Sequence, residues 1–170
     1  MQREIIEHED RWIILPLRQS RIVATEWHSN QVDLILDTGF KVVVGYDAEL
    51  SLRTSKEESP GRHELTHWSS EEAERILESE ILSPVFFKSG GARIALRNGW
   101  LLLLADRPAT SPAAVYSQSS LLWTRDGLSS QTEYPVLRID PWTGQLVTTL
   151  EWPPRPSDLA INYESDDINE

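Results

Sequence analysis

The chain has 170 residues, a net charge of −11 and no cysteine, and these facts exclude several classes of protein. Disulfides and thiolate metal sites are impossible without cysteine, and nucleic-acid binding is disfavoured because neutralising phosphates requires a basic face. The N-terminal residues lack the basic start and apolar stretch of a signal peptide, and no run approaches the ~20 apolar residues that a membrane helix needs. We therefore expect a cytoplasmic protein with no membrane contact.

The N-terminal third of the sequence predicts strands. Residues 12–15 form a short apolar run, which Pro16 confines to a sheet edge or to the end of a strand. A first three-strand meander is expected over about residues 20–54, with a turn at Gly39. Its continuation from Tyr46 to Thr54 alternates apolar and polar residues and predicts a fourth strand.

The next segment, His63-Glu64-Leu65-Thr66-His67, matches the H-E-x-x-H signature of zinc peptidases, in which two histidines bind zinc and the glutamate activates water. That chemistry needs an α-helix, because on a strand the two histidines would lie about 13 Å apart. Residues 53–62 before it are polar, and no third ligand follows in a recognisable motif. We therefore predict a strand or loop and a chance match. A zinc site of His63 and His67, with Glu64 as base, is kept as an alternative only.

A helix is expected over about residues 70–82. Ser69 is its N-cap and Glu72 its third residue, which together form a capping box. Pro84 is expected to end the helix. The apolar residues that recur at helical spacing are Ala73, Ile76, Leu77 and Ile81.

The second meander, about residues 85–106, is organised around Asn98-Gly99. This dipeptide between two apolar runs predicts a two-residue type I′ turn, which places Leu96 opposite Leu101 on the same face. The predicted core face then carries Ala92, Ile94, Leu96, Leu101 and Leu103. The other face, expected to be partly covered, carries Arg93, Ala95, Arg97, Trp100, Leu102 and Leu104.

The two meanders resemble each other in sequence, which we interpret as an internal duplication. The alternative is that two ordinary hairpins are alike by chance. The reversal of charge between the copies suggests that the aspartates of one face the arginines of the other across a pseudo-two-fold axis. The aligned pairs are Gly39 with Gly99, Phe40 with Trp100, Asp33 with Arg93 and Asp37 with Arg97.

The C-terminal part predicts one strand from Val115 to Trp123 and a hairpin over about residues 136–152, around Asp140-Pro141-Trp142-Thr143-Gly144. Residues 157–170 contain five acids and no Lys or Arg, which predicts a disordered tail or, alternatively, an acidic arm that steers a basic partner. The fold expected for residues 1–156 is a single α+β domain, mainly of antiparallel β-strands.

The seven tryptophans suggest where a partner would bind. Most are expected in the core, but Trp142 lies in a predicted turn and is the best candidate for an exposed anchor. The other candidate binding residues are Trp100, Arg93 and Arg97.

In its overall character, acidic and rich in tryptophan, the chain is similar to immunity proteins that neutralise a toxin enzyme. Its repeated glycine–aromatic–aliphatic hairpin, over Arg21 to Ala105, resembles small uncharacterised β-rich bacterial proteins with a duplicated meander. We therefore expect a noncatalytic protein-binding domain with a basic partner and no cofactor. The alternatives are a structural subunit that forms a homo-oligomer through sheet edges, and a zinc hydrolase that uses the motif at 63–67.

Overall fold

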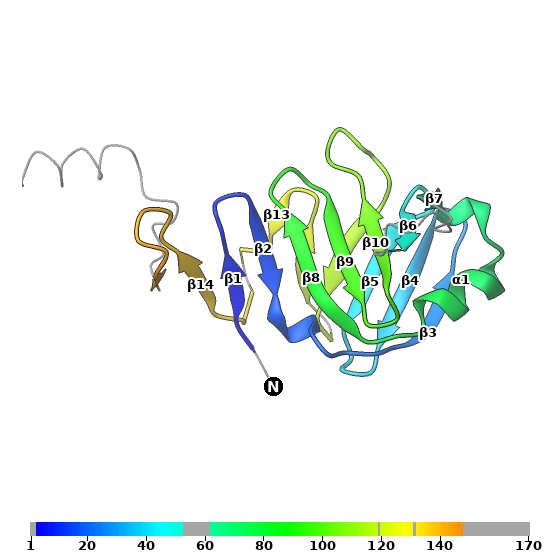
Figure 1. The fold of residues 1–170 in the computed structure, drawn as a ribbon, viewed down its shortest axis with the longest axis horizontal. Coiled ribbons are helices and arrows are strands. Elements are labelled where there is room, and N and C mark those ends of the chain that lie inside the picture. The colour runs from blue at the N-terminus through cyan, green and yellow to red at the C-terminus, as the bar shows by residue number, and fades with distance from the viewer. Residues whose placement is uncertain (1–2, 53–61, 119, 131, 148–170) are drawn as a thin grey trace, which may run out of the picture.

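Two β-sheets stacked face to face, with one short α-helix at their end, make up the described part of the computed structural model (Figure 1). The described residues are 3–52, 62–118, 120–130 and 132–147. Their strands pair antiparallel except for β1 with β14. This confirms the predicted class, an α+β fold dominated by antiparallel strands. No helix in these residues is long and apolar enough to cross a membrane.

Each sheet draws its strands from distant parts of the chain. The nine-stranded sheet contains, in spatial order, β15 (Leu146–Val147), β14 (Val136–Ile139), β1 (Ile5–Glu7), β2 (Arg11–Ile14), β8 (Ile81–Phe87), β9 (Ala92–Leu96), β10 (Trp100–Leu104), β6 (Glu49–Leu52) and β7 (His63–Glu64). The six-stranded sheet contains β13 (Gly127–Leu128), β12 (Leu121–Thr124), β11 (Ala113–Tyr116), β5 (Lys41–Gly45), β4 (Gln31–Leu36) and β3 (Ile22–Trp27).

One hydrophobic core fills the space between the sheets. Alternate residues of the central strands point into it, as expected for sheets with one buried face. The rings of Phe86 in β8 and Trp123 in β12 lie 4.7 Å apart between centroids and join the two layers directly. Both side chains are fully buried, so the sheets share this core rather than each having its own.

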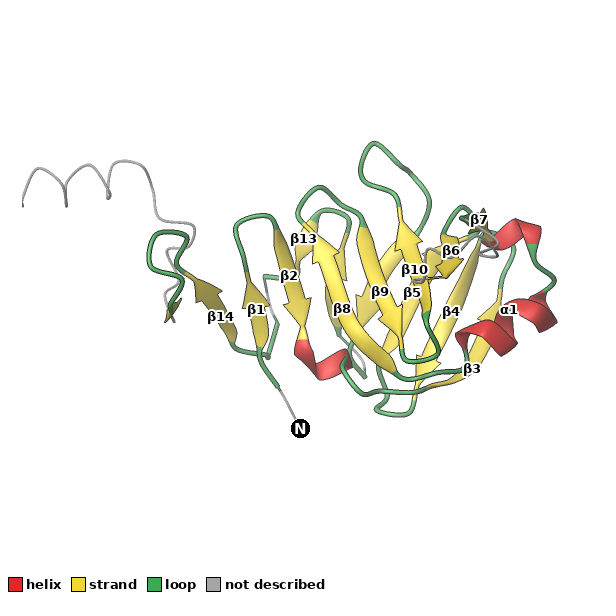
Figure 2. Cartoon of the chain, in the orientation of Figure 1, coloured by secondary structure: helices red, strands yellow, loops and turns green. Residues whose placement is uncertain are grey.

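The helix α1 (Ser70–Leu77) lies beside β3, at the end of the sandwich opposite β14 (Figure 2). Its predicted capping box is present: Ser69 Oγ accepts from the Glu72 N–H at 3.1 Å, and the Glu72 carboxylate accepts from the Ser69 N–H at 3.3 Å. The predicted extension to residue 82 is wrong. Residues 79–81 pair with residues 19–22 instead, and Pro84 lies inside β8.

The two predicted meanders are both present, one in each sheet: β3–β4–β5 in the six-stranded sheet and β8–β9–β10 in the nine-stranded sheet. The strand that follows each meander crosses to the other sheet, so that β6 pairs with β10 and β11 pairs with β5. Both meanders carry a bulge near the start of their first strand. These features are compatible with a duplication, which stays a prediction.

The predicted register of the β9–β10 hairpin is wrong by one residue, because Leu101 pairs with Ala95. The turn is a three-residue loop in which Leu96 accepts a hydrogen bond from the Gly99 N–H at 3.1 Å. Only Gly99 has a positive φ, +96°, so Asn98 does not adopt the conformation that a type I′ turn requires. This shift of one residue exchanges the two faces of β10 and leaves those of β9 as predicted. The core face carries Ala92, Ile94, Leu96, Leu102 and Leu104.

Two further expectations are corrected by the structure. The single strand predicted from Val115 to Trp123 is a hairpin, β11–β12, whose turn begins where the Ser117 N–H donates to the Ser120 carbonyl at 2.8 Å. The C-terminal hairpin is confirmed as β14–β15 as far as residue 147. Its expected end at 152, and the acidic tail 157–170, lie outside the described residues.

The contacts expected between the aspartates of the first meander and the arginines of the second are not formed within the described residues. Arg97 pairs with Glu80 at 2.7 Å, and Asp33 lies 3.9 Å from Lys41. Asp37 accepts from the backbone N–H of Arg21. Arg97, Asp33 and Asp37 therefore each have a partner near their own meander, and Arg93 and Arg97 are exposed.

Candidate functional site

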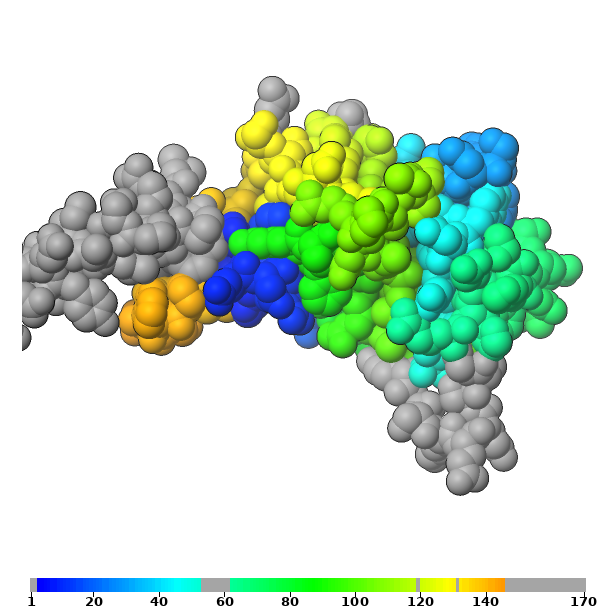
Figure 3. Space-filling model, turned by 90° about the horizontal axis from the view of Figure 1, so that it is seen from above, coloured from blue at the N-terminus to red at the C-terminus, as the bar shows by residue number. Residues whose placement is uncertain are grey.

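The β14–β15 hairpin carries Trp142, whose side chain is 71% exposed, as its position in a predicted turn led us to expect. Asp140 fixes the turn: its carboxylate accepts from the Trp142 N–H at 2.8 Å and from Thr143 Oγ1 at 3.1 Å. Its carbonyl accepts from the Gly144 N–H at 2.8 Å. Seen from above, the hairpin (orange) lies beyond the first strands (blue), at one end of the described chain (Figure 3). Trp142 is therefore presented on a well-defined turn.

The other three candidate binding residues lie elsewhere. Trp100 is half-buried against Trp68, with ring centroids 5.6 Å apart. Arg93 is exposed on β9, and Arg97 is held by Glu80. Three strands separate β9 from β14 in the sheet, which corresponds to about 19 Å between them. The structure therefore does not bring Trp142 together with the other three residues.

The H-E-x-x-H segment is not α-helical. His63 and Glu64 form β7, and Leu65–His67 is a single 3₁₀ turn that ends where the Ser69 cap starts α1. The rings of His63 and His67 meet edge to face, 5.7 Å apart between centroids. Glu64 accepts a hydrogen bond from Thr66 at 3.3 Å. This confirms the predicted strand or loop, and the helical geometry of a zinc peptidase is not formed by this segment.

A cleft of about 560 Å³ opens between β1 and β2 on one side and the β12–β13 hairpin on the other. At its edge the buried Glu7 carboxylate accepts from Lys88 at 2.7 Å and from Arg138 at 3.2 Å. The indole N–H of Trp12 is buried there without a hydrogen-bond partner among the described residues. This cluster could not be predicted from the sequence, because Glu7, Lys88 and Arg138 are far apart in the chain. They come together only when β1 pairs with β2 and β14 in the sheet.

Tyr134 lines the same cleft. Burial raises the pKa of its phenol above the usual value of 10.0, and the nearby charge of Glu133 adds to the effect. The hydroxyl is therefore protonated at neutral pH and can donate a hydrogen bond.

Three residues with metal-binding side chains converge where β3 turns into β4. His28 Nε2 lies 3.1 Å from Asp33 Oδ2 and 4.0 Å from Glu26 Oε2. Glu26 and Asp33 are directly paired across the two strands. Taken alone, each looks like an ordinary surface residue in the sequence. The cluster could have been predicted from the β3–β4 register, which places Glu26 opposite Asp33.

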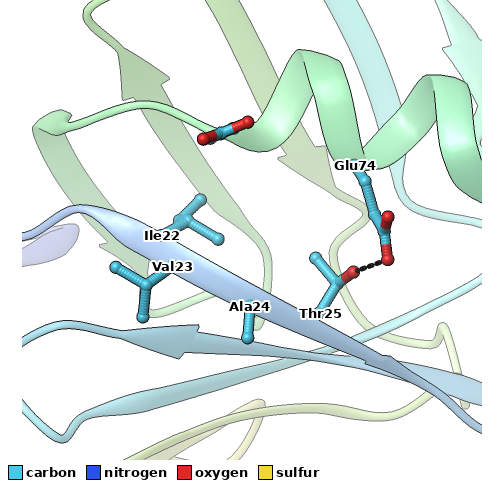
Figure 4. A pocket seen from close by; sticks show the side chains of 6 residues that line it. Ile22, Val23, Ala24, Thr25 and Glu74 are labelled. Atoms are coloured by element: carbon cyan, nitrogen blue, oxygen red, sulfur yellow. Dashed lines mark hydrogen bonds between the residues drawn. The ribbon is translucent and has the colours of Figure 1, made fainter.

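A shallow groove runs between β3 and α1 (Figure 4). Val23, 56% exposed, and Ala24 lie on its strand side, and Glu74 and Glu78 lie on its helix side. Thr25 Oγ1 donates to Glu74 Oε1 at 2.6 Å and ties the helix to the strand. The groove is thus apolar along the strand and acidic along the helix.

No protein-family model matches the chain, and neither a curated protein nor a solved structure is significantly similar to it.

Proposed function

We propose that the chain is a noncatalytic protein-binding domain and that the β14–β15 hairpin contacts its partner through Trp142. The observation that carries this proposal is the 71% exposure of Trp142 on a turn held by Asp140. Tryptophan is enriched among the residues that dominate binding energy. A side chain on a turn that is already ordered loses less conformational entropy when a partner binds.

The partner in this proposal is a basic protein. The net charge of −11 would attract such a protein and accelerate its association. More specifically, we propose that the chain is an immunity-type inhibitor of a basic toxin enzyme. It would act in the cytoplasm, a reducing compartment that suits a chain without cysteine.

The test compares the wild type with Trp142→Ala in capture experiments from an extract of the native host. Val23→Ala is the matched control, because Val23 is also an exposed apolar residue and lies on β3, remote from β14 in the other sheet. A partner retained by the wild type and by the control should bind Trp142→Ala about 30-fold more weakly, the effect of losing about 2 kcal/mol. Equal retention by all three proteins would contradict the proposal.

The assembly alternative rests on a different observation, the exposed Val23 on β3, which is an edge strand of the six-stranded sheet. Light scattering over a range of concentrations distinguishes the two functions. A concentration-dependent increase in mass that Val23→Ala abolishes and Trp142→Ala leaves intact would favour a homo-oligomer over a partner-binding domain.

A further inference from the structure

We propose that Glu26, His28 and Asp33 form a binding site for one divalent transition-metal ion of the zinc type. The site is independent of Trp142 and of the proposed protein-binding function. The three ligand atoms, two carboxylate oxygens and one imidazole nitrogen, all lie within 4.8 Å of one another.

The distances fit a shared ion. Zinc bonds to nitrogen and oxygen ligands are about 2.0–2.2 Å long, so two ligands of a tetrahedral ion lie roughly 3.4 Å apart. The separation from His28 Nε2 to Asp33 Oδ2, 3.1 Å, is slightly shorter, and that to Glu26 Oε2, 4.0 Å, is slightly longer. Glu26 can close the difference because its side chain is 61% exposed and free to turn.

Electrostatics also favour a cation at this point. Glu26 and Asp33 are opposite each other in the β3–β4 ladder, and like charges in that arrangement destabilise a sheet. Asp33 is only 5% exposed, so its charge is poorly screened by water. A doubly charged ion between the two carboxylates would convert this repulsion into attraction.

Gln31 and Tyr46 hold the ligands in position, and neither contacts the Asp33 oxygen that faces His28. Gln31 Nε2 donates to Asp33 Oδ1 at 2.8 Å, which leaves Oδ2 directed at the imidazole. The hydroxyl of Tyr46 donates to the His28 carbonyl, and the Tyr46 ring stacks on Trp27, with centroids 6.0 Å apart. Such supporting contacts are characteristic of metal sites, where they fix the orientation of the ligands.

The donor set selects the type of ion. Mg²⁺ and Ca²⁺ take oxygen ligands, whereas a mixture of imidazole and carboxylate suits zinc and related transition metals. Lys41 is the competing cation, because its Nζ lies 3.9 Å from Asp33 Oδ2 and 4.9 Å from the centre of the Tyr116 ring. Its side chain is 39% exposed, so it can move to solvent when an ion binds.

The experiment measures the affinity of the full chain for Zn²⁺ by competition with a chromophoric chelator. We expect one ion per chain, with binding at least about tenfold weaker in Glu26→Gln and in His28→Gln. Lys41→Gln should bind Zn²⁺ more tightly, because it removes the competing charge. Glu71→Gln, an exposed acid on α1, is the matched control and should behave as the wild type. Glu26 is preferred to the buried Asp33 because its exposed side chain can be changed without disturbing the core.

Three results would overturn the proposal. The first is equal affinity in the wild type, Glu26→Gln and His28→Gln. The second is an affinity that falls in His67→Asn but not in His28→Gln, which would place the ion at the histidine pair of residues 63 and 67. The third is displacement of Zn²⁺ by an equal concentration of Mg²⁺, which would indicate general attraction to acidic groups. A rise in the melting temperature on addition of Zn²⁺, seen in the wild type and absent in Glu26→Gln, would support it independently.

Discussion

At the scale of single residues, Tyr134 links burial to the pH dependence of stability. Burial raises the pKa of its phenol in the folded state, so the unfolded chain loses the proton at a lower pH than the folded chain does. The stabilising contribution is therefore complete below a pH of about 10 and is lost as the pH rises through the folded-state pKa. We expect Tyr134→Phe to lose less stability than the wild type above this pH, measured as urea midpoints at pH 8 to 11. An identical alkaline loss in both proteins would contradict this assignment.

The buried carboxylate of Glu7 shows how burial changes the contribution of an ion pair to the free energy of unfolding. It bridges Lys88 and Arg138, whose side chains are 26% and 14% exposed. We expect Glu7→Gln to lower the free energy of unfolding by about 2–4 kcal/mol, because it leaves two cations without a counter-charge. Glu80→Gln is the control, since it breaks a single pair with the exposed Arg97 and should cost less than about 1 kcal/mol. Equal losses in urea unfolding would show that the bridge is not effectively buried.

At the scale of elements, the two meander turns provide a matched pair of glycines. Gly39 and Gly99 have φ values of +89° and +96°, a region that costs an L-residue about 1–2 kcal/mol. A Cβ at Gly39 would also lie 3.1 Å from Gln118, whereas one at Gly99 would meet nothing within 4 Å. We therefore expect both alanine variants to be destabilised in urea, and Gly39→Ala more than Gly99→Ala. The reverse order would mean that Gln118 moves aside and that the turns differ in strain.

The same turns show which parts of the fold could be predicted from sequence. The position of the Gly99 turn and the start of α1 could be predicted, because a glycine and a capping box act over a few residues. The register of β9–β10 could not, since its turn also makes a non-local contact, in which Asn98 Nδ2 donates to the carbonyl of Ile76 at 2.5 Å. That contact comes from α1, 22 residues earlier in the chain. Non-local contacts also explain why α1 ends before residue 82, because residues 79–81 pair with residues 19–22.

The candidate sites also differ in whether they could be predicted from the sequence. The exposure of Trp142 could be predicted, because a residue in a turn has little opportunity to pack. The cluster of Glu26, His28 and Asp33 could not, because it depends on the β3–β4 register. The contacts of Glu7 could not be predicted either, because Arg138 lies next to Glu7 only through the parallel pairing of β1 with β14.

At the scale of the whole molecule, the exchange of strands between the sheets implies that the two meanders cannot fold separately. Because β6 pairs with β10 and β11 pairs with β5, each sheet is completed by a strand that follows the other meander. We expect one unfolding transition in urea, with superimposable curves from tryptophan fluorescence and far-ultraviolet circular dichroism. Two separate transitions would indicate that the meanders are independent units.

The contact between Phe86 and Trp123 gives this cooperativity a direct test, because one ring belongs to each sheet. Phe86→Ala should lower the free energy of unfolding by about 3–5 kcal/mol, since it removes a fully buried ring and leaves a cavity at the centre of the core. If the sheets unfold together, the midpoints from both probes should shift by the same amount. Leu121→Ala is the control, because Leu121 is 39% exposed and its truncation should have a small effect. A shift confined to one probe would show that the two sheets do not unfold in a single step.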